Sequence, residues 1–149
     1  SLCVPPVVAT LGVALPMWLV ARISPALAVE LPGHLVVACV FVAAGVAVSV
    51  AGVLEFRRVR TTVNPLRPEK ASALVTSGVF RWTRNPMYLG LALVLAGCAW
   101  WLANAAALVL VAVFVAWIDR LQVVPEERAL RRKFGAEFEQ YVASVRRWI

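Results

Sequence analysis

The chain has 149 residues, of which 62% are hydrophobic and 15% charged, with a net charge of +7 and a mean hydropathy of +0.82. A soluble domain is usually about 45–50% apolar and about a quarter charged. This composition therefore excludes a disordered chain, a disulfide-rich mini-protein and an ordinary cytosolic domain.

The charged residues are segregated along the chain. No Asp, Glu, Lys or Arg occurs in residues 1–21, 31–54 or 85–118. Uncharged apolar runs of about 18 or more residues are typical of membrane spans. We therefore expect an integral membrane protein that forms one domain over residues 1–149.

The first two apolar runs each predict one transmembrane helix. The first gives a span over residues 4–22. A signal peptide is the alternative for this run, but the run has no basic start and is interrupted by Pro5, Pro6 and Pro16. The second run gives a span over residues 33–56.

The third run is too long for one span. Its 34 residues would form a straight helix of about 51 Å, whereas the hydrocarbon core of a bilayer is about 30 Å thick. A hairpin with spans 86–102 and 104–121 fits better. Trp100, Trp101 and Asn104 mark its turn, because Trp favours the membrane interface and Asn tolerates turn geometry.

The basic residues predict how the bundle is oriented. Fourteen of the 15 lie in residues 57–84 or 120–147. The positive-inside rule places both segments in the cytosol, and a hairpin between them puts them on the same side. The sequence thus predicts an all-α bundle of about four transmembrane helices in a bacterial inner membrane, with both termini cytosolic. The basic excess would contact anionic lipids, and no nucleic-acid partner is expected.

The cysteines and the single histidine give no sign of a metal site. Cys3, Cys39 and Cys98 each lie in an apolar run without a second Cys nearby, as small buried residues do. His34 has no Cys, His or acidic partner at ligand spacing. We therefore expect no metal.

The first charged segment predicts an ordered cytosolic loop over residues 57–85, with a short β-like stretch at residues 73–75. The loop ends in Asn85 and Pro86, and Asn at the N-cap followed by Pro is a strong helix start. The free N–H groups of that helix start would face the cytosol and suit an anionic group.

Two residues of the following turn extend this interpretation. Gly90 would allow a ligand close to the backbone, and Tyr88 supplies a ring and a hydroxyl near the interface. The alternative is a capped helix with an interfacial tyrosine and no ligand.

The second charged segment predicts cytosolic helices over residues 125–148. Pro125, followed by two acidic residues, is typical of a helix start, and Gly135 is expected to break the helix. The apolar residues of this segment recur at steps of three and four, which predicts an amphipathic helix on the membrane or over the cytosolic end of the bundle. These residues are Leu130, Phe134, Phe138, Tyr141, Val142 and Val145.

Glu126 and Glu127 follow the last span and should lie at the same depth as residues 84–88. Two carboxylates beside a basic helix start could bind the amine and hydroxyls of a polar cofactor. The alternative is that they form surface salt bridges with Arg128 and Arg131.

Two motifs together resemble a known family. LVTSGVFRWTRNPMYLG (residues 74–90), followed by PEERALRRKFGAEFEQYVASVRRWI (residues 125–149), resembles the isoprenylcysteine carboxyl methyltransferase family. Phospholipid methyltransferases of the same wider group look similar. The resemblance covers about the last 90 residues. Many eukaryotic members carry His at the position of Asn85, whereas many bacterial members carry Asn, as this sequence does. This difference bears on the identity of the acceptor rather than on cofactor binding.

The resemblance implies an S-adenosylmethionine-dependent methyltransferase that releases S-adenosylhomocysteine. Such an enzyme is built from membrane helices rather than a Rossmann domain, in agreement with the absence of any GxGxxG motif here. Carried onto this sequence, the cofactor pocket would use Val75, Thr76, Gly78, Arg84, Asn85, Pro86, Tyr88, Gly90, Glu126 and Glu127.

The resemblance also implies a lipophilic acceptor that enters from the bilayer. The carboxylate of a prenylcysteine-like substrate is the first expectation, and Arg81 or Arg84 would orient it. A phospholipid amine, a thiol or another small hydrophobic acceptor is the alternative. Glu127 or Tyr88 would take the proton from an amine.

Two other classes of function remain as alternatives. One is a four-span exporter that acts as a dimer, but such transporters usually need a carboxylate inside the membrane. Glu30, Glu55 and Asp119 all lie at the ends of apolar runs, which argues against transport. The other is a membrane scaffold without catalytic activity.

Overall fold

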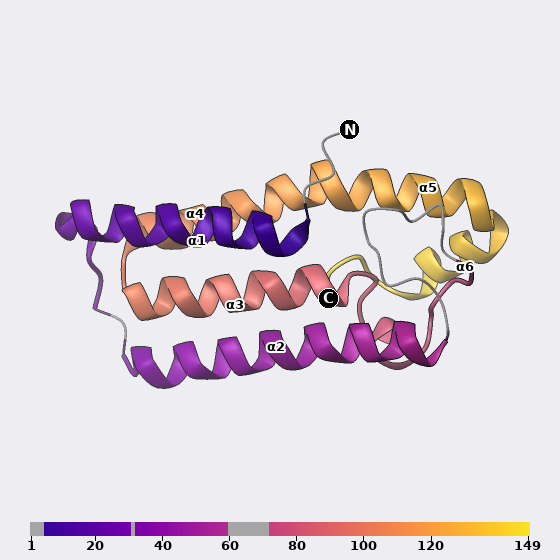
Figure 1. The fold of residues 1–149 in the computed structure, drawn as a ribbon, viewed down its shortest axis with the longest axis horizontal. Helices are drawn as coiled ribbons and strands as arrows, with labels where there is room; N and C mark the ends of the chain where they lie inside the picture. The colour runs from indigo at the N-terminus through magenta and orange to yellow at the C-terminus, as the bar shows by residue number, and fades with distance from the viewer. Residues whose placement is uncertain (1–4, 31, 60–71) are drawn as a thin grey trace.

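The computed structural model describes residues 5–30, 32–59 and 72–149. Figure 1 shows an elongated bundle whose apolar helices run along its long axis. These helices are α1 (Pro6–Ile23), α2 (His34–Arg58), α3 (Pro86–Leu102) and α4 (Ala105–Ile118).

The prediction of an all-α fold is confirmed for the described residues, which contain no named strand. Residues 73–75, predicted to be β-like, have no regular structure. Part of the predicted loop 57–85 (residues 60–71) and the first residue of the predicted span 4–22 lie outside the described residues.

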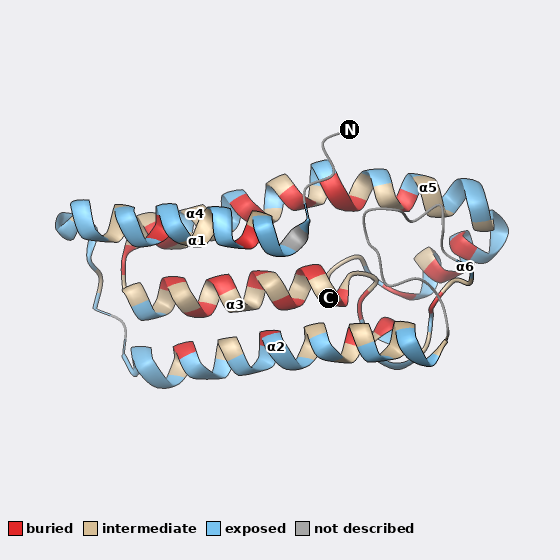
Figure 2. Ribbon diagram, in the orientation of Figure 1, coloured by how far each residue is buried: buried red, intermediate tan, exposed pale blue. Residues whose placement is uncertain are grey.

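Helix α3 lies at the centre of the bundle and contacts α1, α2 and α4. Figure 2 shows buried residues along its whole length, whereas much of α1 and α2 is exposed. Many of the exposed side chains on α1 and α2 are large and apolar, such as Leu11, Leu15, Val36 and Val40. An exposed apolar face of this kind suits contact with lipid.

Small residues bring α2 and α3 close together. Ala38, Gly45 and Gly52 are buried and recur every seven residues along α2. A Cβ atom added at Gly45 would lie 2.5 Å from the carbonyl oxygen of Gly90, and one added at Gly97 would lie 2.9 Å from that of Ala38. Backbones approach this closely in membrane bundles only where the residues are small.

The predicted hairpin turn is confirmed. α3 ends at Leu102 and α4 begins at Ala105. Asn104 is the N-cap of α4, and its Oδ1 accepts a hydrogen bond from Ala106 N at 3.0 Å. Its Nδ2 donates to Ser24 O at 3.1 Å, so this side chain also fastens the turn to the end of α1.

The predicted helix start at Pro125 is wrong. α4 continues without a break through a π-helical segment, Asp119–Val123, into α5 (Val124–Phe134). Val124 N donates to Asp119 O, five residues earlier. Because a π-helical turn already departs from the i to i−4 pattern, it accommodates a proline, which has no N–H to donate.

Beyond α5 the chain turns back onto the bundle. Gly135, with φ of 52°, separates α5 from α6 (Ala136–Ser144), as predicted. The predicted helix ran to residue 148, but α6 ends at Ser144, and residues 145–149 are not helical. The apolar residues of α6 pack with the loop before α3 in one cluster, made of Phe138, Tyr141, Val145, Val75 and Phe80.

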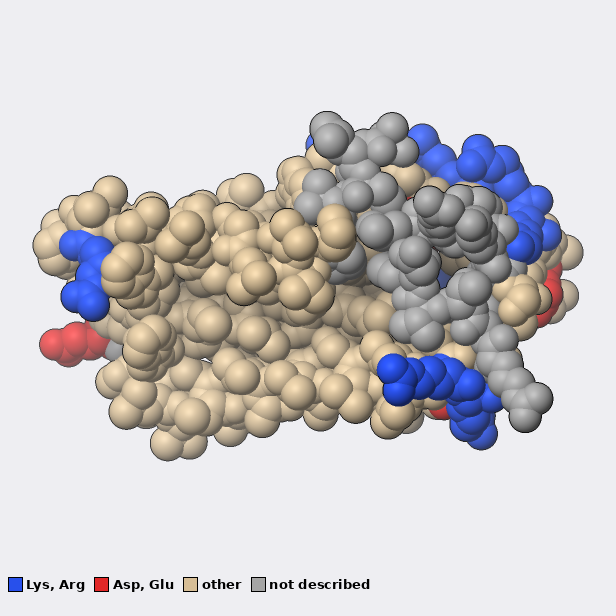
Figure 3. All heavy atoms as spheres, viewed as in Figure 1, with Lys and Arg blue, Asp and Glu red and all other residues tan. Residues whose placement is uncertain are grey.

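In the described part of the chain, two helices are long and apolar enough to cross a membrane: α2 and the continuous helix Ala105–Phe134. α3 and residues Val7–Ile23 of α1 are shorter apolar helices. Figure 3 shows the charged side chains gathered at the two ends of the molecule, with an uncharged middle. We call the end formed by η3 (Gly78–Arg81), α5 and α6 the basic end.

Candidate functional site

The start of α3 lies at the basic end, as predicted, but Asn85 does not cap it with its side chain. Asn85 Nδ2 instead donates to Arg147 O at 3.0 Å. Thr83 Oγ1 donates to the same carbonyl at 3.3 Å, and Arg84 N donates to Arg146 O at 3.1 Å. The segment after α6 is thus bound to the residues that begin α3, and the first N–H groups of α3 have no capping side chain.

Glu127 is the acidic centre of this end. Its Oε1 accepts from Arg84 Nη2 at 3.0 Å and from Arg147 Nε at 3.1 Å, and its Oε2 accepts from Arg147 Nη2 at 2.7 Å. The side chains of Glu127 and Arg84 are only 10% and 9% exposed. These bonds raise the pKa of Arg147, chiefly through the hydrogen bonds from its guanidinium to Glu127.

Arg84 and Arg147 each reach a second part of the fold. Arg84 Nη1 donates to Val142 O at 3.2 Å and to Val145 O at 2.8 Å, at the end of α6, where a cation is favoured. Arg147 Nη1 donates to Asp119 Oδ2 at 3.2 Å. Through Arg84 and Arg147, the carboxylate of Glu127 therefore connects the start of α3, the end of α6 and the π-helical segment.

The second glutamate has a different partner. Tyr88 Oη donates a hydrogen bond to Glu126 Oε1. Glu126 lies beyond the apolar stretch 105–118, and its pKa is raised to about 8, chiefly because burial disfavours the charged form. The hydrogen bond from Tyr88 opposes this shift, and the negative charge of Glu127 adds to it. A carboxyl group with a pKa near 8 can hold or release a proton at physiological pH.

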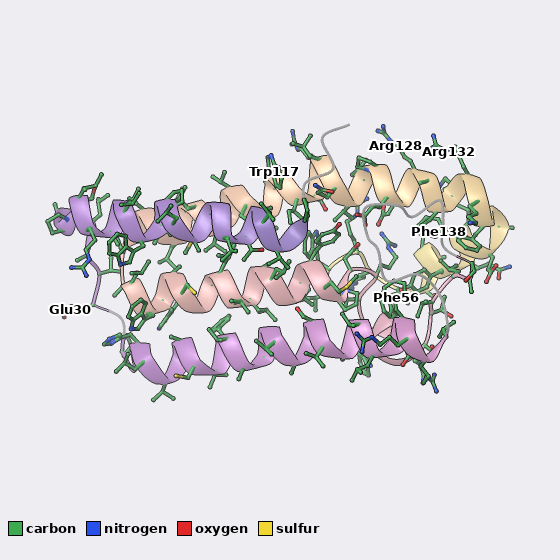
Figure 4. All side chains as sticks on the ribbon, in the orientation of Figure 1. Glu30, Phe56, Trp117, Arg128, Arg132 and Phe138 are labelled. Carbon is green, nitrogen blue, oxygen red and sulfur yellow. The ribbon has the colours of Figure 1, made fainter. Side chains whose placement is uncertain are left out.

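Neither glutamate is bonded to Arg128 or Arg131, the partners proposed in the alternative interpretation. Arg131 bonds to Glu139. Figure 4 shows Arg128 and Arg132 pointing away from the bundle. For Glu127, the surface salt-bridge interpretation is therefore wrong.

The loop before α3 lies against α2 and α6. Val75 is buried in the cluster with Phe138, whereas the side chain of Thr76 is exposed. Gly78 has φ of 58°, which favours glycine, and a Cβ there would lie 2.7 Å from Glu55 Oε2. Glu55 also accepts a hydrogen bond from Ser77. Glu55 thus fixes the conformation of this loop.

Three other predicted site residues are either exposed or packed against α2. Arg81 is exposed. Gly90 and Pro86 face α2, where they pack against Gly45 and Gly52. The structure therefore gives Gly90 a packing role, and its part in cofactor binding stays a prediction.

Sequence reasoning missed Arg147, Asp119 and Trp148. Trp148 Nε1 donates to Asp119 Oδ1 at 3.0 Å, beside the Arg147–Asp119 pair. The only signal in the sequence was Asp119 itself, a lone acid at the end of an apolar run, for which a cationic partner is expected. Among the described residues, no group of three or more His, Cys, Asp or Glu is placed to hold a metal ion.

Comparison with known proteins gives two matches. Residues 34–137 match the family model described as phospholipid methyltransferase. A stretch of 63 residues, 42% of this chain, is 41% identical to an uncharacterized protein of Haemophilus influenzae and covers 100% of that protein. No solved structure matches the chain at a significant level.

The family match spans α2, α3, α4 and α5 and includes the whole of the first motif. It confirms the wider methyltransferase group that the two motifs resemble. Because the match covers more than half of the chain, this protein belongs to the phospholipid methyltransferase family, whose description together with the long apolar helices indicates a membrane methyltransferase.

Proposed function

We propose that this chain transfers a methyl group from S-adenosylmethionine to the amine of a lipid acceptor at the basic end of the bundle. The observation that carries the proposal is the Tyr88–Glu126 pair. The carboxyl group of Glu126 accepts a hydrogen bond from Tyr88 and has a pKa of about 8. The next residue, Glu127, binds Arg84, which immediately precedes the start of α3.

The residues at this end fit a polar, positively charged methyl donor. The N–H groups in the first turn of α3 have no capping side chain and suit its carboxylate. Glu126 suits its amine or sulfonium, and the exposed Thr76 and the Gly78 backbone border the same end of the bundle. Bound there, S-adenosylmethionine would supply an electrophilic methyl group.

The chain's own part in the reaction is to align the acceptor and to take up a proton. An ammonium group must lose a proton before its nitrogen can attack a methyl carbon. Glu126 is suited to accept that proton because a general base works best with a pKa near the working pH. Tyr88, through its hydrogen bond, holds the carboxyl group in place.

A prenylcysteine-like carboxylate is the second candidate acceptor, favoured by the resemblance of the two motifs. It would need a cation to orient it. Of the two arginines that the resemblance offers for this role, Arg84 is already paired with Glu127. Arg81, exposed on η3, is therefore the candidate. Glu127 is therefore assigned a structural role here, and Glu126 that of the base.

We further propose that α1, α2, α3 and α4 all cross the membrane, with α5, the rest of the basic end and both termini in the cytosol. The segregation of charge supports this orientation. A bacterial inner membrane is the proposed location.

The test is transfer of a tritiated methyl group from S-adenosylmethionine to a panel of acceptors in detergent micelles. The panel contains phosphatidylethanolamine, a prenylcysteine and a long-chain thiol. We expect the phosphatidylethanolamine to be labelled. Glu126→Gln should lower kcat at least about 100-fold, because a general base usually contributes a factor of this size to the rate. Glu139→Gln, an exposed matched change on α6, should keep full activity. Label in the prenylcysteine alone would overturn the amine assignment.

A further inference from the structure

The π-helical segment determines which residues share a face of the continuous helix formed by α4 and α5 (Figure 1). Asp119 and Glu127 are eight residues apart. In a regular α-helix such residues lie about 80° apart around the axis, whereas residues seven apart lie within about 20°. The hydrogen bond from Val124 N to Asp119 O spans five residues rather than four, so the turn contains one extra residue. The two carboxylates therefore lie on the same face of the helix.

The side chain of Arg147 binds both of these carboxylates. Its Nη2 and Nε donate to Glu127 at 2.7 and 3.1 Å, which makes this contact bidentate. Its Nη1 donates to Asp119 Oδ2 at 3.2 Å. All three nitrogens of the guanidinium are thus bound to one helix face, which the single ammonium group of a lysine could not reproduce.

The backbone of the same residue is bound to the start of α3. Arg147 O accepts from Asn85 Nδ2 at 3.0 Å and from Thr83 Oγ1 at 3.3 Å. The next residue, Trp148, packs against the hydrophobic core and so helps to fix this segment. Arg147 therefore connects the α4–α5 helix, through its side chain, to the residues that begin α3, through its carbonyl group.

The Tyr88–Glu126 pair depends on the same two elements. Tyr88 lies in the first turn of α3 and Glu126 in the first turn of α5. The hydrogen bond between them can form only while these two turns keep their relative position. Arg84 and Arg147 both link the turns through Glu127. Arg84 makes one hydrogen bond to Glu127, whereas Arg147 makes two and also binds the α4–α5 helix at the π-helical segment.

We propose that Arg147 is a positioning residue for the proposed reaction, because it connects the α4–α5 helix to the start of α3 and thereby holds Glu126 against Tyr88. This inference rests on the proposed function in that Glu126 is the proton acceptor. A merely structural role for Arg147 would affect the basic end as a whole, whereas a positioning role affects the Tyr88–Glu126 pair first.

The first test observes Tyr88 directly and needs no catalysis. The chain has two tyrosines, so tyrosine labelled with carbon-13 at Cζ gives two NMR signals in detergent micelles. The signal that is missing in Tyr88→Phe belongs to Tyr88. In the wild type it should titrate with Glu126, with a midpoint near pH 8. In Arg147→Gln, and in Arg147→Lys, which keeps the positive charge, it should move toward the value of a solvated tyrosine and lose this titration.

Tyr141 and Arg146 supply the controls. Tyr141 Oη donates to Phe80 O at 2.8 Å, so its signal reports whether the basic end stays folded, and it should not move in either variant. Arg146→Gln removes an exposed charge from the neighbouring residue and should leave both signals unchanged. An unchanged Tyr88 signal in Arg147→Gln, or equal movement of both signals, would overturn the positioning role.

The second test is kinetic. Arg147→Gln and Arg147→Lys should each lower kcat for methyl transfer at least about tenfold, because a displacement of about 1 Å in a catalytic site can cost up to about 100-fold. Since Arg147 acts through the Tyr88–Glu126 pair, the double variant Arg147→Gln/Tyr88→Phe should be no slower than the slower of the two single variants. Losses that multiply in the double variant would contradict this role.

These tests separate the inference from the proposed function. A Tyr88 signal that moves alone in both Arg147 variants, without methyl transfer by the wild type, would support the positioning role and overturn the function. Methyl transfer that is lost in Glu126→Gln but fully kept in Arg147→Gln would support the function and overturn the positioning role.

Discussion

Glu127 joins parts of the chain that are far apart in sequence. It binds Arg84, 43 residues before it, and Arg147, 20 residues after it. A carboxylate so nearly buried is stable only when its oxygens are paired with donors. The same argument applies to the two arginines, so the loss of any one partner leaves a charge without compensation.

Glu127→Gln should therefore lower the free energy of unfolding by about 3 kcal/mol or more, because it leaves two arginines partly unpaired. Thermal unfolding in detergent, followed by tryptophan fluorescence, measures this. The exposed Arg131–Glu139 pair supplies the control. Glu139→Gln should cost less than about 1 kcal/mol, and equal losses for the two variants would show that Glu127 is not a buried centre.

Glu126 predicts how stability depends on pH. Its pKa is about 8 in the folded protein, above the ordinary value of 4.5, so the folded state holds its proton more tightly than the unfolded state. The free energy of unfolding should therefore fall as pH rises from about 5 to 8, by on the order of 1 kcal/mol per pH unit at most. Denaturation at several pH values measures this slope.

Glu126→Gln removes the titrating group and should flatten the pH dependence over that window. A variant that kept the wild-type slope would show that another group is responsible. Tyr88→Phe removes the hydrogen bond that lowers the pKa of Glu126, so it should move the window to higher pH.

At the level of elements, the packing of α2 on α3 positions the site. The start of α3 and the loop before it both lie against the last turns of α2, through Gly52 and Glu55. Ser49 Oγ on α2 also donates to Met87 O at 3.5 Å. Any change that separates these two helices should therefore disturb the candidate site as well as the fold.

Gly97→Ala tests this close packing. Its Cβ would lie 2.7 Å from a Val42 methyl group and 2.9 Å from Ala38 O. The backbone atom cannot move aside cheaply, so we expect a loss of about 1–3 kcal/mol in thermal unfolding experiments. Gly12→Ala on α1 is the matched control, because nothing lies within 4 Å of the added atom. A stable Gly97→Ala protein would mean that α2 and α3 are farther apart.

The sequence correctly predicted those helix ends and breaks that single residues specify through their own backbone preferences. Asn104 and Pro86 mark helix ends through their own backbone preferences, and Gly135 marks a break for the same reason. The helix start predicted at Pro125 was wrong because the preceding π-helical turn accommodates this proline inside one continuous helix. Arg147 was missed because its partners lie at least 20 residues away, and spacing in the sequence gives no sign of such contacts.

At the scale of the whole molecule, the segregated charges of the sequence become two charged ends separated by an uncharged middle. Glu30 lies toward the end opposite the basic end (Figure 4), and Arg22 belongs to the last turn of α1, which ends there (Figure 1). In the proposed orientation the basic end faces the cytosol, where a water-soluble methyl donor is available.

Cysteine labelling tests this orientation. In a cysteine-free background, Lys133→Cys at the basic end and Glu30→Cys at the opposite end place single thiols on the two sides. In intact cells, a membrane-impermeant maleimide should label Glu30→Cys but not Lys133→Cys, and lysis should expose both. The reverse pattern would contradict the cytosolic position of the site.

Binding of S-adenosylhomocysteine tests the central claim, a cofactor site at the basic end, most directly. Isothermal titration calorimetry of the protein in detergent should show saturable binding of one molecule per chain. Glu126→Gln should weaken this binding, and Glu139→Gln should not. A folded wild-type protein that releases no heat of binding at millimolar ligand, or that binds equally well in both variants, would contradict the account.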